Sequence, residues 1–93
     1  MYQEFTSRNH GYITNDLQAH IGSTIILIAG CGLGSVSAEV AVRTGFKKFI
    51  LVDGDTVGVS NLNRQIFNFS DVGKFKAQAL KERLLAINPE VEV

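Results

Sequence analysis

The sequence predicts an α/β fold in which a parallel sheet is flanked by helices. Two apolar segments, 24–29 and 49–52, are predicted as strands, and each is followed by a segment whose apolar residues recur at helical spacing. Strands that alternate with helices are typical of parallel sheets joined by crossovers. A complete sheet of this kind has more strands, so we expect these 93 residues to form the first half of a truncated fold.

The composition argues against several classes of function. The nine basic and nine acidic side chains cancel, so nothing indicates a nucleic-acid partner or a membrane surface. The single cysteine excludes an internal disulfide framework, and a reducing, cytoplasmic setting is the simplest expectation. The N-terminus lacks the features of a signal peptide, and the longest apolar stretch, 25–29, is too short to span a bilayer.

Residues 1–23 are expected to form an N-terminal arm with one short helix. The Thr14-Asn15-Asp16 sequence is suited to cap this helix, which should end near Gly22. The segment 24–29 then runs through apolar and β-branched residues without alternation. Such a run is typical of a strand buried on both faces, as in a parallel sheet covered by helices.

The first helix of the 24–93 segment follows a cluster of glycines. We expect its inward face to carry three apolar residues at helical spacing: Leu33, Val36 and Val40. Glu39 and Arg43 are spaced i,i+4 and are expected to pair on the exposed face. Gly45 is placed to end the helix as its C-cap.

The second strand, 49–52, is followed by a polar loop and a second amphipathic helix. The inward positions of that helix are expected to be Phe75, Ala79, Leu80, Leu84 and Ile87. The Asn88-Pro89 pair ends it, and 91–93 resembles the opening of a third strand. The sheet then has an open edge, which we expect to pair with another copy of the chain in a homodimer.

The glycine cluster is suited to hold a nucleotide phosphate. Gly30, Gly32 and Gly34 lie between a strand and a helix, where a bare backbone and free helical N–H groups can approach an anion. Ser35 could cap the helix or add a hydroxyl contact. Asp53 ends the next strand, at about the 20-residue distance expected of a ribose-binding carboxylate in a Rossmann-like fold.

Two residues depart from the usual glycine pattern. A G-x-G-x-x-G sequence that ended at Gly34 would require glycine at the positions of Ala29 and Cys31. We interpret Cys31 as a small buried residue and not as a nucleophile, because nothing near it in sequence would lower the pKa of its thiol.

A group of phosphate donors follows the acidic residue. Asn61, Arg64, Gln65 and Lys76 come soon after Asp53, and they exceed what a dehydrogenase needs at this point. Arginine offers a planar fork to phosphate oxygens, and lysine gives a movable charge. The alternatives are ordinary ones: Arg64 and Lys76 could be solvated, and Asp53 could cap a turn with the glycine after it.

The sequence Ser60-Asn61-Leu62-Asn63-Arg64-Gln65, after Asp53-x-Asp55, resembles the ThiF/MoeB and ubiquitin-activating enzyme superfamily. The resemblance runs from about Arg8 to Val93. It implies that the position of Gly32 lies against the phosphates, that Asp53 holds the ribose, and that a set of donors surrounds the triphosphate: Asn61, Arg64, Gln65 and Lys76. It also implies that Arg8 reaches into the site of a partner subunit.

The resemblance further implies an enzyme that uses ATP to adenylate the C-terminal carboxylate of a ubiquitin-like or sulfur-carrier protein. Mg²⁺ is expected, with its aspartate ligand beyond Val93, so no metal ligand is assigned within the chain. Two alternatives stay open. The strand–glycine–helix–acid pattern also suits an NAD-dependent oxidoreductase, and the departures at Ala29 and Cys31 leave room for a noncatalytic dimerising scaffold.

Overall fold

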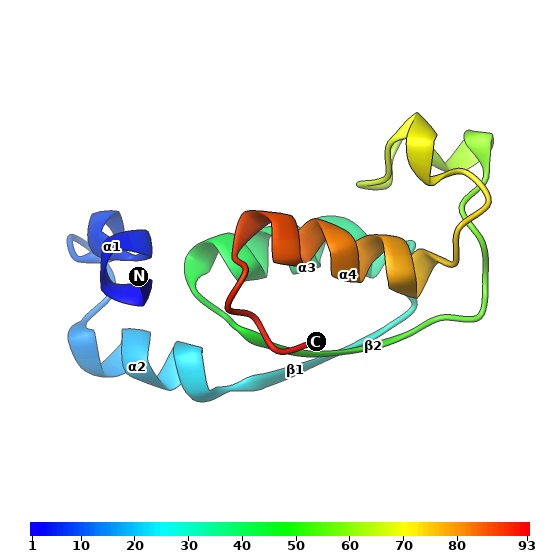
Figure 1. Cartoon of the computed structure of the whole chain (residues 1–93). Coiled ribbons are helices and arrows are strands. Elements are labelled where there is room, and N and C mark those ends of the chain that lie inside the picture. Colours follow the sequence, from blue (N-terminus) through cyan, green and yellow to red (C-terminus); the bar gives the residue numbers. More distant parts are fainter.

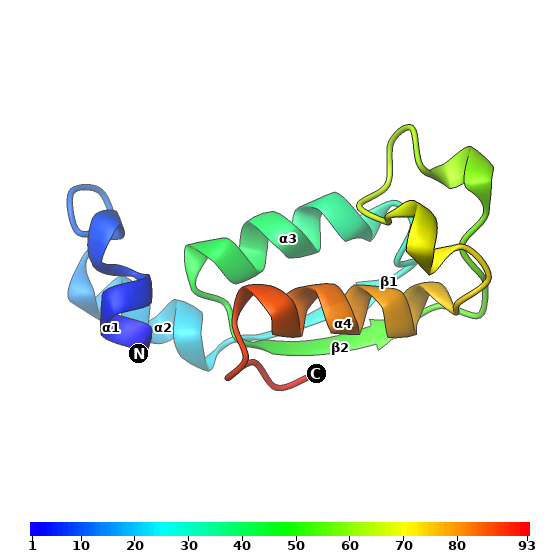
Figure 2. The ribbon, with the colours of Figure 1, turned by 45° about the horizontal axis from the view of Figure 1, so that its top comes forward.

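The sheet of this protein consists of two parallel strands with both crossover helices on one face. The computed structural model describes residues 1–93. Strand β1 (Ile25–Ala29) pairs with β2 (Lys48–Val52), and Ile25 lies opposite Lys48. Helix α3 (Gly34–Thr44) connects them, and α4 (Lys76–Ile87) packs beside it (Figures 1 and 2). The predicted α/β fold with a parallel sheet and flanking helices is confirmed.

The third strand begins where the sequence indicated it. The Phe49 N–H donates to the Glu92 carbonyl at 2.8 Å, and the Glu92 N–H donates to the Lys47 carbonyl at the same distance. These bonds form a parallel bridge between Lys48 and Glu92. The new strand therefore lies beside β2, which leaves β1 at the edge of the sheet.

The N-terminal arm folds into three short helices: α1 (Tyr2–Phe5), η1 (Ser7–Asn9) and α2 (Asn15–Ser23). The predicted helix is α2, and the Thr14 hydroxyl accepts the Leu17 N–H at 3.1 Å as its cap. The other two helices are too short to show a periodicity in the sequence. None of the helices in the chain combines the length and the apolar character needed to cross a bilayer.

A polar clasp joins the arm to the end of α3. The amide groups of Asn9 and Gln18 donate to the Thr44 carbonyl at 3.1 and 3.0 Å, and the Tyr2 hydroxyl lies 2.9 Å from the Gly45 carbonyl oxygen. Gly45 ends α3 as predicted, with φ of 119°. A side chain at this position would also meet the Gln18 amide and the Tyr2 hydroxyl. The clasp therefore requires glycine there.

The inward face of α3 is not the predicted one. The residues that pack against the sheet and α4 are Ser35, Ala38 and Val42, whereas Leu33 is 95% exposed and Val36 and Val40 also face outward. The small side chains of Ser35 and Ala38 let the first half of the helix lie close to the strand, so shape decides the buried face there over hydrophobicity. The predicted Glu39–Arg43 pair forms at 3.3 Å, but Glu39 also pairs with Arg83 of α4 at 2.7 Å.

Two further expectations about burial are corrected. Helix α4 buries Ala79, Leu80 and Leu84 as predicted, but Phe75 precedes the helix and is exposed, and the Lys76 side chain is buried instead. The strands are covered on one face only, because α3 and α4 lie on the same side of the sheet (Figure 2). The opposite face exposes four apolar side chains: Ile25, Leu27, Ile50 and Val52.

Candidate functional site

The glycine turn lies at the C-terminal ends of the strands, where open α/β sheets bind their ligands. Gly30 has φ of 96°, and its N–H donates to the Val52 carbonyl at 2.9 Å, so the turn continues the pairing of β1 with β2. Gly34 begins α3 against β1, and a Cβ on it would lie 2.5 Å from Cγ2 of Ile28. The turn is therefore held tightly between a strand and a helix.

Asp53 is tied to this turn by its carboxylate. One oxygen accepts the N–H of Cys31 at 2.8 Å, and the other accepts the N–H of Asp55 at the same distance. The hydrogen bond from Asp55 is the largest influence that holds the pKa of Asp53 below its ordinary value, with those from Cys31 and Gly32 and the charge of Lys76 adding to it. A carboxylate oxygen can accept more than one hydrogen bond, so capacity for a ribose diol remains.

Cys31 behaves as a buried structural residue, as its sequence context indicated. Its side chain is fully buried, and this burial raises the pKa of the thiol, with the nearby Asp53 charge adding to the effect. A thiol that stays protonated is a poor nucleophile. Its backbone N–H, not its sulfur, connects it to the site.

Gln65 and Lys76 converge on Gly32 from two different elements. A Cβ on Gly32 would lie 3.0 Å from Nε2 of Gln65 and 3.2 Å from Nζ of Lys76. The Lys76 side chain is only 8% exposed, and none of the four ion pairs of the chain includes it. Oε1 of Gln65 is buried without a hydrogen-bond partner. An ammonium group and an amide thus meet over bare backbone, which is an arrangement suited to an anion.

Ser35 does not face this space. Its side chain is fully buried, and the hydroxyl donates to the Gly32 carbonyl at 2.8 Å and accepts the Ile66 N–H at 3.2 Å. The expectation that it caps α3 is also corrected, because the cap position is Leu33. Ser35 lies one residue into the helix, where its side chain points inward, beneath the turn.

Asn61 and Arg64 lie on the loop that follows β2 and belong to its internal structure. The Asn61 side-chain oxygen accepts the Gly58 N–H at 2.8 Å and closes η2 (Val59–Asn61). Nη1 of Arg64 donates to the Ser60 carbonyl at 3.0 Å and to the Asn63 side chain at 2.8 Å, and Arg64 is exposed. Its guanidinium is therefore near the loop surface and has no hydrogen bond to the glycine turn in this structure.

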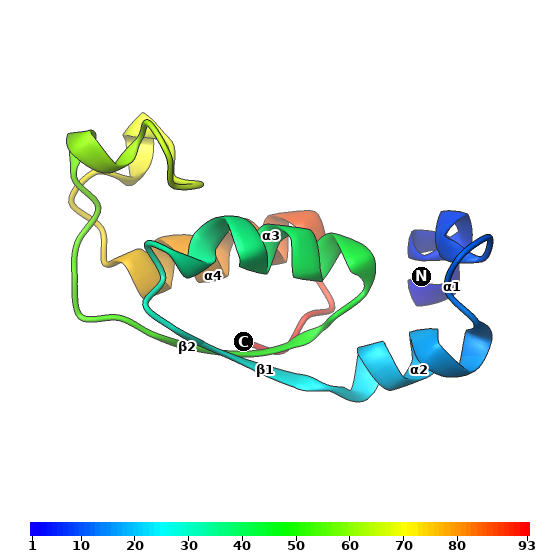
Figure 3. The same ribbon diagram turned by 180° about the vertical axis from the view of Figure 1, so that it is seen from behind.

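Arg8 is far from the other predicted site residues. It is exposed on η1 within the N-terminal arm, and the molecule measures 40 Å along its long axis. Figure 3 shows the arm at one end and the start of α3 at the other. The structure does not bring Arg8 to the glycine turn of its own chain.

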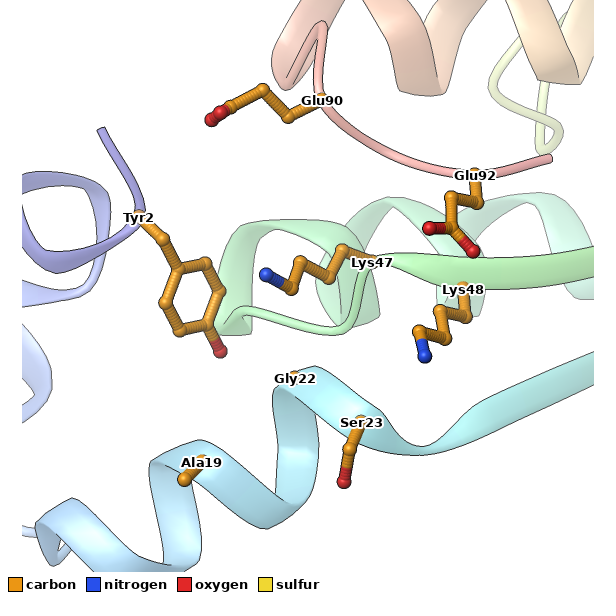
Figure 4. Close-up of a pocket in the computed structure, with 8 residues that line it drawn as sticks. All are labelled: Tyr2, Ala19, Gly22, Ser23, Lys47, Lys48, Glu90 and Glu92. Carbon is orange, nitrogen blue, oxygen red and sulfur yellow. The ribbon is translucent and has the colours of Figure 1, made fainter.

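A cleft of about 400 Å³ lies at the end of the sheet away from the glycine turn, between the N-terminal arm and the start of β2. Its lining includes two lysines and two glutamates, and the Lys47 ammonium lies 4.4 Å from the centre of the Tyr2 ring (Figure 4). None of the predicted site residues lines it. The residues that suit a nucleotide gather at the glycine turn instead, so we place the candidate site there.

The comparison with known proteins decides the family. The sequence profile of the ThiF family matches residues 6–93, nearly the whole chain. The chain belongs to the ThiF family. The resemblance that the Ser60–Gln65 sequence indicated is therefore confirmed.

Several members of the ThiF family can be compared with the chain directly. Ubiquitin-like modifier-activating enzyme 5 of Dictyostelium discoideum is 39% identical over 80 residues, which are 86% of this chain and 21% of that protein. The structure of the E. coli tRNA N6-threonylcarbamoyladenosine dehydratase in complex with ATP is 33% identical, with a TM-score of 0.92, over 98% of this chain and 38% of that one. E. coli MccB with ATP is 33% identical, with a TM-score of 0.84, over 96% and 29%.

These ThiF-type relatives are enzymes, and two of the solved structures contain ATP. The chain spans well under half the length of each of them. Over that shared segment, its fold closely matches the folds of the two ATP-bound enzymes. Nucleotide binding is thus a property of relatives with the same local fold.

Sequence reasoning missed one part of the site, the contact between the turn and the middle of the loop. The acceptor for the Ile66 N–H is Ser35, thirty-one residues away, and a backbone N–H has no residue-type signal. A serine in the first turn of a helix suggested a cap or a ligand contact. Only the packed structure distinguishes these from a link to a distant loop.

Proposed function

We propose that this ThiF segment binds ATP at the glycine turn and that the full-length protein adenylates a carboxylate. The carrying observation is the convergence of Lys76 and Gln65 over Gly32, beside the Asp53 carboxylate. The Lys76 ammonium takes part in none of the ion pairs of the chain, so it is available to an anionic ligand at the turn. The ATP-bound structures of two relatives support the same ligand.

Each residue has a distinct role in this proposal. Phosphate oxygens lie against the bare backbone of Gly32 and the positive end of the α3 dipole, and Asp53 accepts the ribose hydroxyls. ATP supplies the activated phosphorus that the carboxylate attacks as pyrophosphate leaves. Lys76 and Arg64 offset the negative charge that gathers as two anions approach. Arg64 would first have to leave its hydrogen bonds within the loop.

No group of three or more potential ligands among His, Cys, Asp and Glu gathers in the chain. Mg²⁺ is usually held by one or two carboxylates together with substrate phosphates and water, so the chain offers no complete site of its own for this ion. We propose that the aspartate ligand for Mg²⁺ lies outside these residues.

The proposed substrate is the C-terminal carboxylate of a ubiquitin-like or sulfur-carrier protein. The relative named as a modifier-activating enzyme supports this class. We also propose a homodimer, in which Arg8 reaches the site of the partner subunit, since its own glycine turn lies at the far end of the molecule. A cytoplasmic setting suits the single, unpaired Cys31.

A second candidate substrate is a modified tRNA nucleoside that carries a carboxylate. It is favoured by the match to the tRNA dehydratase, which covers 98% of the chain with a TM-score of 0.92. The 93 residues themselves supply no basic excess of the kind that RNA-binding surfaces carry. We therefore place the carrier protein first.

The test is ATP–pyrophosphate exchange by the full-length protein, with candidate carriers and with modified tRNA as separate substrates. Lys76→Ala and Arg64→Ala should each abolish exchange and leave the melting temperature near that of the wild type. Lys81→Ala is the matched control, because Lys81 is exposed on the same helix as Lys76. No exchange with either substrate, together with tight NADH binding, would overturn the proposal. Full exchange in both variants would overturn the residue assignment.

A further inference from the structure

We propose that Ser35 is a positioning residue that holds Gln65 over the glycine turn, an inference that rests on the proposed ATP site. Its hydroxyl uses its proton and a lone pair at once, on the Gly32 carbonyl and on the Ile66 N–H. One buried oxygen therefore joins the glycine turn to the loop at the residue that follows Gln65. The nucleotide is not its direct partner.

The Ser35 bond adds a polar contact to a loop that is held at two other places. Its base is closed by backbone bonds, from the Val57 N–H to the Lys74 carbonyl at 2.8 Å and from the Gly73 N–H to the Val57 carbonyl at 2.9 Å. Residues 59–71 extend beyond the end of the sheet (Figures 2 and 3), and Phe67 anchors them in the core at 5% exposure. The bond between Ser35 and Ile66 fixes this segment to the turn at the point where Gln65 meets Gly32.

The two groups that meet over Gly32 are held in different ways. Lys76 is on α4, and its N–H donates to the Asp55 carbonyl at 2.9 Å, so its position does not depend on Ser35. Gln65 is on the loop and is adjacent to the bonded Ile66. Loss of the Ser35 hydroxyl should therefore release the amide of Gln65 and leave the ammonium of Lys76 in place. A general loss of structure would instead displace both groups, so the two explanations can be distinguished.

In nucleotide-free protein, Ser35→Ala should speed hydrogen exchange at the Ile66 amide and shift the NMR signals of the Gln65 side-chain amide. Ser37→Ala is the matched control, because Ser37 is exposed on the same helix and makes no side-chain hydrogen bond. Unchanged signals for Gln65 and Ile66 in Ser35→Ala would overturn the proposal whether or not ATP binds. If Ser35→Ala does not fold, Ser35→Cys takes its place in the experiment, because cysteine is close to serine in size and forms weaker hydrogen bonds.

ATP titration then measures the effect on the site. Ser35→Ala should weaken ATP binding about tenfold, the order of one net hydrogen bond. In a Gln65→Ala background the same change should have almost no effect, because the group that it positions is gone. An equal loss in both backgrounds would overturn the positioning role. Absence of ATP binding by the wild type would instead refute the proposed function. Hydrogen exchange at the Ile66 amide would still show whether Ser35 holds the loop.

Discussion

The glycine turn contains two glycines whose replacement by alanine should give opposite results. At Gly34 a Cβ would lie 2.5 Å from Cγ2 of Ile28, about 1 Å inside the usual carbon–carbon contact of 3.5–4.0 Å. Such overpacking costs about 1–3 kcal/mol, and the preference of helices for alanine over glycine returns up to about 1 kcal/mol. We expect Gly34→Ala to lower the free energy of unfolding by about 1–2 kcal/mol.

For a domain of this size, such a loss lowers the melting temperature by roughly 5–15 °C. Gly32→Ala is the comparison, because its new methyl would meet only the ends of the Gln65 and Lys76 side chains, and its φ is not in the left-handed region. It should melt near the wild type and lose ATP binding, because the methyl group fills the space over the turn. Thermal unfolding by circular dichroism and ATP titration measure the two effects. If Gly34→Ala melts with the wild type, or Gly32→Ala binds ATP normally, the reasoning from these contacts is wrong.

Two further changes test the rest of the structure. Gly45→Ala should lower the free energy of unfolding by about 2 kcal/mol or more, because it imposes a positive φ on alanine and pushes the Gln18 and Tyr2 side chains apart; an unchanged melting temperature would contradict the clasp. The lowered pKa of Asp53 stabilises the fold above the ordinary pKa of 3.8, and this contribution is lost as the pH falls through the folded-state value. Between pH 7 and pH 3, urea unfolding should therefore show a smaller fall in the free energy of unfolding for Asp53→Asn than for the wild type. An equal fall in both proteins would refute the stabilising role of the Asp53 carboxylate.

The order of the elements was predictable because its signals are local. The apolar run of β1, the glycines after it and the Gly45 cap each depend on neighbouring residues, and the structure has all of them. The buried face of α3 was predicted wrongly because it depends on the shape of the space between the sheet and α4. Ser35 and Ala38 fill that space, while Val36 and Val40 are left outside.

The candidate site was predictable to a similar depth. Asp53, Gln65 and Lys76 have residue types suited to a nucleotide, and the structure brings all three to the turn. The role of Ser35 was not predictable, because its partner is a backbone N–H on a distant loop. The expected reach of Arg8 across subunits involves a second chain and stays a prediction.

The apolar composition of β1 has a consequence for how the chain avoids aggregation while it folds. The stretch Thr24–Ala29 contains six residues without charge, proline or glycine, which is the composition of segments that stack into fibrils. In the folded chain β2 pairs with it and α3 packs against it. Any change that loosens the pairing of β1 with β2 exposes this uncharged run to other chains, so correct pairing of β1 protects the chain from cross-β association as it folds.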